Sequence, residues 1–139
     1  MRILGIDPGE KNIGVAISDP TGTLARPLAV LTMTSRKEAA QQILQFAEEE
    51  QAEAIIIGQS TDVDGKPDYS GRKAARLAGE IRNQTQLPIT LWDESNSTQI
   101  ARESRIELGV SRKNRQGHLD ERAAAVILQS YLDYLAQSA

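Results

Sequence analysis

The chain has 139 residues, a length that suits one domain with a substantial hydrophobic core. Hydrophobic residues make up 40% and charged residues 25%, and no apolar run approaches the ~20 residues of a membrane span. There is no cysteine and only one histidine, His118, which excludes disulfides, thiolate metal sites and multi-histidine zinc sites within one chain. The N-terminus carries no signal-peptide pattern, so we expect a cytoplasmic protein that does not bind a membrane.

The net charge of −3 at pH 7 argues by itself against a nucleic-acid-binding protein. Any contact with nucleic acid must therefore use a local basic patch, helped by cations bound at acidic residues.

The first third of the chain predicts three short strands. Residues 3–6 and 13–17 are apolar runs, and the turn residues of segment 7–12 separate them. Residues 24–31 form a third run after the turn at 20–22. Strands joined by such short turns predict an antiparallel meander.

The remaining chain alternates between helical and strand patterns. Ser35 and Glu38 form a capping box, which predicts a helix that continues to about Gln51. The later expected elements are a strand over 54–58, a helix around 74–81, a strand over 88–92, a helix from Ser95 or Asn96 to Leu108, and a C-terminal helix over 119–134. This order predicts an α/β fold of one domain, residues 1–139, with a mixed five-stranded sheet and helices on both faces.

Three carboxylates stand where structural residues are not expected. Asp7 ends the first apolar strand, and Glu94 follows Asp93 at the end of the fifth. Asp120 precedes apolar residues at helical spacing, which turns it toward the core-facing side of the last helix. Converging carboxylates repel each other, and divalent cations bound between them relieve the repulsion. Oxygen ligands of this kind favour magnesium, manganese or calcium over zinc.

Each carboxylate also has an ordinary structural interpretation. Asp7 precedes Pro8 and Gly9, so it could start a turn. Asp93 or Glu94 could lie beside a helix cap or form a salt bridge, and Asp120 could be favoured by the helix dipole.

The opening segment Gly5-Ile6-Asp7-Pro8-Gly9, with Ile13 to Ala16, resembles the YqgF/RuvX family, whose members are relatives of the RuvC Holliday junction resolvases within the RNase H-like fold. The resemblance covers nearly the whole chain. The other matching segments are Arg26–Leu28, Ile56–Gly58 with Asp64–Gly65, Asp93–Glu94 with Ser97–Thr98, and Asp120 with the helix through Tyr131. Four residues at three places depart from the family pattern: Gln59-Ser60 replaces Leu-Pro, Ser95 replaces arginine and His118 replaces lysine.

The resemblance implies an RNase H-like fold and a metal-dependent endonuclease that hydrolyses phosphodiester bonds. It implies processing of the 5′ end of the 16S rRNA precursor and cleavage of branched DNA such as Holliday junctions as candidate activities. Asp7, Glu94 and Asp120 would be both the catalytic residues and the ligands of two Mg²⁺ or Mn²⁺ ions. Asp7 would bridge the ions, and a metal-activated water would leave 5′-phosphate and 3′-hydroxyl ends.

A basic segment precedes Asp120 in the chain. Arg112, Lys113 and Arg115, followed by His118, have no acidic residue among them, and glycines flank the stretch. We expect a surface loop that contacts the phosphate backbone of nucleic acid. The alternative interpretation is a solvated loop that only aids solubility.

Two other functions fit parts of the sequence. Actin-like ATPases also place Asp-x-Gly after a strand, but they need two such domains around the nucleotide, and this length supplies one. A non-catalytic RNA- or protein-binding module that retains the fold is the main alternative to a nuclease. The sequence leaves open whether two copies form a homodimer.

Overall fold

The computed structural model describes residues 1–94 and 119–138, excluding the side chains of residues 119–121. The described elements are β1 (Ile3–Pro8), β2 (Asn12–Ser18), β3 (Ala25–Thr32), α1 (Arg36–Glu49), β4 (Ala54–Gln59), α2 (Tyr69–Gln84), β5 (Ile89–Asp93) and α4 (Leu119–Gln137). All five expected strands and three of the expected helices are therefore confirmed. The helix expected up to Leu108 lies outside the described residues. No helix in the described part of the chain is long and apolar enough to cross a bilayer.

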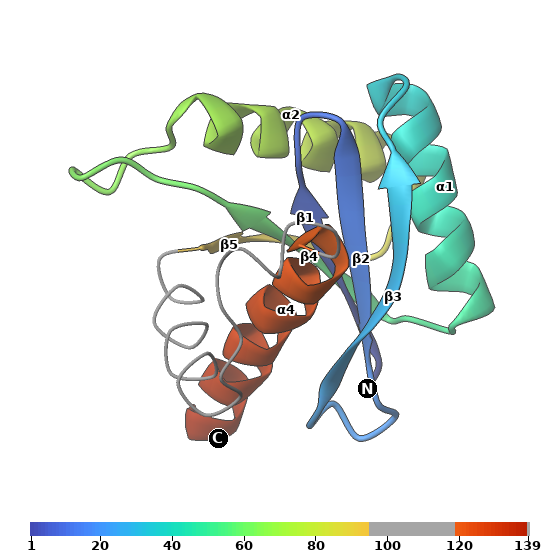
Figure 1. Cartoon of the computed structure of the whole chain (residues 1–139). Helices are drawn as coiled ribbons and strands as arrows, with labels where there is room; N and C mark the ends of the chain where they lie inside the picture. Colours follow the sequence, from blue (N-terminus) through green and yellow to red (C-terminus); the bar gives the residue numbers. More distant parts are fainter. Residues whose placement is uncertain (95–118, 139) are drawn as a thin grey trace.

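The five strands form one mixed sheet in the order β3-β2-β1-β4-β5 (Figure 1). β2 pairs antiparallel with both β1 and β3, which confirms the meander. β4 runs parallel to β1 and to β5, as expected when helices connect the strands. The first strand of the chain therefore lies at the centre of the sheet.

The end of β1 differs from the prediction. Asp7 pairs with Gly14, and Pro8 pairs with Ile13, so two residues assigned to the turn belong to the strand. Gly9 donates a backbone hydrogen bond of 2.9 Å to the Asn12 carbonyl and closes the hairpin. A proline is tolerated here because it ends the strand, where no ladder hydrogen bond is lost.

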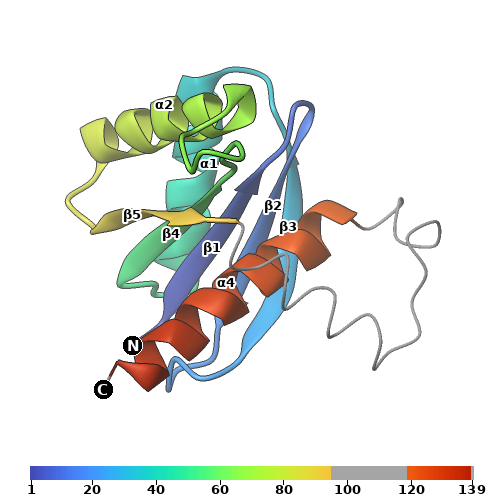
Figure 2. The ribbon, with the colours of Figure 1, turned by 90° about the vertical axis from the view of Figure 1, so that its left-hand side faces the viewer.

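Alternating side chains divide the core into two layers. One face of the sheet packs against α1 and α2 through Leu4, Ile6, Val15, Ile55 and Ile57. The other face presents Ile3, Ala16 and Ile56 to the α4 residues Ala124, Ile127 and Leu128. Figure 2 shows α1 and α2 on one side of the sheet and α4 on the other. The expected RNase H-like arrangement, with helices on both faces, is confirmed.

Side-chain caps fix the beginnings of α1 and α2. The Ser35 hydroxyl accepts a hydrogen bond from the Glu38 backbone N–H at 3.1 Å, as expected of the capping box. The Asp68 carboxylate accepts one from the Gly71 N–H at 2.8 Å and caps α2. Asp68 thus anchors α2 at the end of the sheet where β4 ends.

Candidate active site

Asp7 and Glu94 lie close together, although another strand separates the two strands to which they belong. Asp7 belongs to β1, and Glu94 directly follows β5, with β4 between them. The Glu94 backbone N–H donates to the Gln59 carbonyl at 3.0 Å, which holds Glu94 against the end of β4. A side-chain hydrogen bond joins the two carboxyl groups.

Gly58 in β4 makes room for this contact. A Cβ atom at position 58 would lie 2.9 Å from the Glu94 Oε1 atom and 2.7 Å from the Ile127 Cδ1 atom of α4. Because Gly58 has no side chain, the Glu94 side chain can extend across the end of β4 toward Asp7.

The surroundings of Glu94 disfavour its charged form. Burial is the main factor that raises the pKa of the Glu94 carboxyl, and the negative charges of Asp68 and Asp93 raise it further. The hydrogen bond with Asp7 acts in the opposite direction and lowers this pKa in part. The site is therefore a partly buried carboxyl group surrounded by other acids.

Asp68 is a member of this acidic group that the sequence analysis missed. The Ser60 hydroxyl and the Gly71 backbone N–H both donate to its carboxylate, and these bonds lower the pKa of Asp68. An aspartate directly before a helix is the pattern of an N-cap, and this signal could have identified its structural role. Its proximity to Glu94 depends on how β4, β5 and α2 pack, which no local pattern reveals.

Gln59 and Ser60, which depart from the family pattern, connect the end of β4 to α2. The Gln59 amide donates to the Gly71 carbonyl at 3.0 Å, and Ser60 donates to Asp68. Asp93 accepts a hydrogen bond from the Thr61 hydroxyl at 3.2 Å. These polar residues therefore hold α2 and its capping carboxylate in place beside Glu94.

Asp120 is the second residue of α4, and its side chain lies outside the described part of the structure. The helix begins toward the end of the sheet where β1 ends, in both views (Figures 1 and 2). Farther along α4, Ala124 and Ile127 are buried against the sheet. The predicted nucleic-acid contacts Arg112, Lys113, Arg115 and His118 also lie outside the described residues.

The donor set suits a hard divalent cation. Within residues 1–94 and the described side chains of α4, no three acidic or histidine side chains are placed to ligate one metal ion together, although several acids lie near Glu94. Asp7 and Glu94 offer oxygen ligands alone, which Mg²⁺ and Mn²⁺ prefer and Zn²⁺ does not. A cation would also relieve the unfavourable surroundings of Glu94. The two residues fit such an ion as part of its ligand set.

Sequence comparisons place the chain among known proteins. Residues 1–134 match the model of the family RuvX, described as Holliday junction resolvase. A protein of Desulforamulus reducens named "Putative pre-16S rRNA nuclease" is 38% identical, over 96% of this chain and 97% of that protein. A protein of the same name from Thermoanaerobacter pseudethanolicus is 39% identical, over 96% of each chain.

Solved structures show the same fold at low sequence identity. RuvC from T. thermophilus, in complex with a Holliday junction substrate, has a TM-score of 0.67 and 19% identity, covering 100% of this chain and 97% of that one. The fowlpox virus resolvase, in complex with Holliday junction DNA, has a TM-score of 0.55 and 15% identity, covering 97% and 99%. These likenesses support the RNase H-like fold.

Proposed function

The chain belongs to the RuvX family, and on this premise we propose that it is a cytoplasmic nuclease, one domain over residues 1–139, that hydrolyses phosphodiester bonds. The observation that carries the proposal is the placement of the Asp7 and Glu94 carboxyl groups at the same end of the sheet, on either side of the end of β4. The names of the relatives point to the precursor of 16S rRNA as substrate, and the family description points to branched DNA.

The proposed cofactor is Mg²⁺ or Mn²⁺, held by Asp7, Glu94 and Asp120 in a two-metal-ion site. Bound ions of this kind polarise a phosphate and lower the pKa of a water molecule. The role of Asp120 is supported by its spacing, because it precedes Ala124 and Ile127 by four and seven residues on the helix. The Ile127 Cδ1 atom and the Glu94 Oε1 atom lie 2.7 Å and 2.9 Å from the position that a Cβ of Gly58 would take, so this part of α4 lies beside Glu94.

The central test compares Asp7→Asn with the wild type and with Asp64→Asn, which changes an exposed turn carboxylate. Labelled 16S precursor RNA and four-way DNA junctions are incubated with Mg²⁺ or with chelator. We expect cleavage to fall more than about 100-fold in Asp7→Asn, because even outer-shell partners of a metal typically cost 10–100-fold. The fold should remain intact, since the amide removes charge from a crowded acidic group.

The outcomes separate the nuclease from a binding module. Full activity of Asp7→Asn in Mg²⁺ would contradict the proposed site. If the wild type cleaves neither substrate, and calorimetry shows no Mn²⁺ binding, the chain is a non-catalytic binding protein.

We further propose that Arg112, Lys113, Arg115 and His118 contact the phosphate backbone of the substrate. Phosphate contacts give salt-dependent affinity without sequence specificity. Replacing the three cations together with alanine should weaken binding to RNA and DNA alike. The slope of log affinity against log salt should flatten by up to about 3 units, with metal binding unchanged. If the salt slope of the triple variant equals that of the wild type, the segment is a solvated surface that does not contact phosphates.

A further inference from the structure

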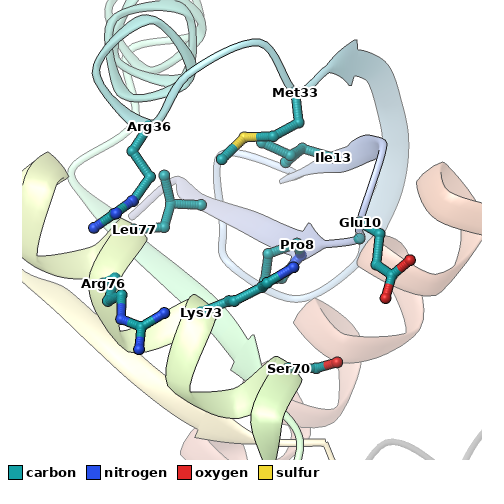
Figure 3. A pocket seen from close by; sticks show the side chains of 10 residues that line it. Pro8, Glu10, Ile13, Met33, Arg36, Ser70, Lys73, Arg76 and Leu77 are labelled. Atoms are coloured by element: carbon teal, nitrogen blue, oxygen red, sulfur yellow. The ribbon is translucent and has the colours of Figure 1, made fainter.

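A cavity of about 210 Å³ lies between the β1–β2 hairpin and the first half of α2 (Figure 3). Its walls come from β1, β2 and α2 and from the beginning of α1. The cavity is smaller than the roughly 300–1,000 Å³ of typical small-molecule sites. It therefore suits a group of about the size of one base, and not a whole coenzyme.

One side of the cavity is basic. Arg36 begins α1, and Lys73 and Arg76 lie three residues apart on α2, so their side chains are neighbours on the helix surface. The ion pairs among the described residues both belong to Glu50, so these three cations have no carboxylate partner within that part of the chain. In Figure 3, the Glu10 carboxylate lies on the opposite side from the two guanidinium groups. The basic side is thus available to an anion.

The other lining is apolar. Ile13 and Leu77 are almost fully buried and close the floor, while Pro8 and Met33 are partly exposed at the wall. A wall of apolar atoms beside cations matches a nucleotide, whose base has an apolar face and whose phosphate is an anion.

The cavity adjoins the acidic site through the chain itself. Pro8 directly follows Asp7, and successive residues of a strand point to opposite faces of the sheet. Ser70 lines the cavity two residues after Asp68. The Asp7 site and the cavity therefore lie on opposite faces of the sheet at the end of β1. A nucleic-acid strand bound at Asp7 can reach the cavity by passing around this end.

An exposed aromatic ring stands beside the basic side. The Tyr69 side chain is 58% exposed, and the Lys73 ammonium lies 4.6 Å from its ring centroid. Aromatic rings interleaved with cations are the usual surface for unpaired bases, which stack on the ring while cations hold the backbone.

We propose that this cavity binds one unpaired nucleotide of the substrate strand, with its base against Pro8 and Met33 and its phosphate at Lys73, Arg76 and Arg36. The inference rests on the proposed nuclease function, and it specifies the substrate class. Substrates would carry an unpaired nucleotide near the cleaved bond, as at a junction or a single-stranded end.

The first test measures binding by fluorescence anisotropy in the presence of chelator, so that cleavage plays no part. The ligand is a labelled duplex with one unpaired nucleotide. The variant Lys73→Ala/Arg76→Ala is compared with Lys37→Ala/Lys66→Ala, which removes the same charge from exposed positions outside the cavity. We expect the first variant to bind at least about tenfold more weakly, and its salt slope to fall by about 1.4 units for two single-strand phosphate contacts. Equal losses in both variants would overturn the proposal.

The second test examines the base. Replacing the unpaired nucleotide with an abasic residue should weaken binding by the wild type about fivefold or more, as expected when a stacked base is lost. In the Met33→Ala variant, the difference in affinity between the normal and the abasic duplex should be smaller than in the wild type. If the abasic duplex binds as well as the normal one, the cavity does not receive a base. If free AMP occupies the cavity without displacing the duplex, the site is one for mononucleotides and the proposal is wrong.

These readouts are independent of hydrolysis. If the wild type fails to cleave any substrate but binds the unpaired nucleotide through Lys73 and Arg76, the proposed function falls and the binding site stands. If cleavage depends on Asp7 while the two binding tests fail, only the cavity proposal falls.

Discussion

The single carboxylate of Asp68 affects both the beginning of a helix and the pKa of Glu94. It caps α2 by accepting the Gly71 N–H, and its negative charge raises the pKa of Glu94. The first effect requires that Asp68 stays ionised, which the hydrogen bond from Ser60 favours. The beginning of one helix and the charge state of the candidate active site are therefore linked through one side chain.

This link predicts a pH-dependent contribution to stability. The folded protein holds the pKa of Asp68 below its ordinary value of 3.8, so the ionised group stabilises the fold above that value. This stability is lost as the pH falls through the lower, folded pKa. At pH 7, Asp68→Ala should therefore unfold at a lower urea concentration than the wild type. The difference between the two urea midpoints should become smaller at pH 3 and below.

The matched control is Asp64→Ala, which alters an exposed turn carboxylate in the same connection between β4 and α2. Its difference from the wild type should be small at each pH, with chelator present throughout. A gap for Asp68→Ala that stays constant down to pH 2 would contradict the charged cap.

At the scale of residues, the sequence indicates candidates but not their neighbours. Asp7 and Glu94 attract attention because a charge ends an apolar run. The Glu94 side chain reaches toward Asp7 across Gly58, a residue of a third strand whose missing side chain leaves room for it. That requirement is a property of three packed strands, and no spacing along the chain expresses it.

Among the elements, α4 packs unusually close to the sheet at two glycines. A Cβ at Gly5 would lie 2.7 Å from the Leu128 Cβ atom, which moves only with the helix backbone. A Cβ at Gly58 would instead meet the outer ends of the Ile127 and Glu94 side chains, which can rotate away. The same substitution therefore has different consequences at the two positions.

This contrast predicts different effects of two alanine variants. Gly5→Ala should lower the free energy of unfolding by about 1–3 kcal/mol, the usual cost of overpacking, and should leave Mn²⁺ affinity largely unchanged. Gly58→Ala should cost less stability but weaken Mn²⁺ binding and cleavage, because Glu94 must move. Chemical denaturation and calorimetry measure both quantities. Equal loss of metal affinity in the two variants would argue against a specific role of Gly58.

Hydrophobic periodicity predicts the type of each described element well and its boundaries less well. The apolar repeat of α2 becomes visible only near Ala74, whereas the helix begins at Tyr69 because Asp68 caps it. Similarly, Asp7 and Pro8 look like turn residues, but pairing with β2 extends β1 through both. In each case a tertiary or capping interaction outweighs the local composition.

For the whole molecule, net charge is a poor guide to partners. The chain is acidic overall, yet α2 carries Arg72, Lys73, Arg76 and Arg82 against the single acid Glu80. The segregation of charge, with cations on α2 and acids at the ends of β1 and β5, becomes visible only in the fold. The order of strands and helices, by contrast, sufficed to predict a mixed sheet, because a helical connection makes neighbouring strands parallel.

If the proposed metal site at the end of β1 exists, a bound ion should stabilise the entire fold. A ligand that binds only the native state adds about 2.7 kcal/mol of stability at 100 times its Kd. Mn²⁺ or Mg²⁺ at that concentration should therefore raise the melting temperature of the wild type by several degrees. Asp7→Asn should lose most of this increase, and Asp64→Asn should keep it. An equal increase in all three proteins would indicate non-specific ion binding.

The arrangement of α4 over the strands of the N-terminal half also orders events during synthesis. The ribosome makes β1, with Asp7, about a hundred residues before α4, and nascent chains begin to fold while they emerge. Until α4 arrives, Ile3, Ala16 and Ile56 have no helix to cover them. If Asp120 completes the metal site as proposed, the growing chain also lacks one ligand. The proposed nuclease would then emerge from the ribosome unable to cut, and would gain that ability only once α4 has left the ribosome and packed against the sheet.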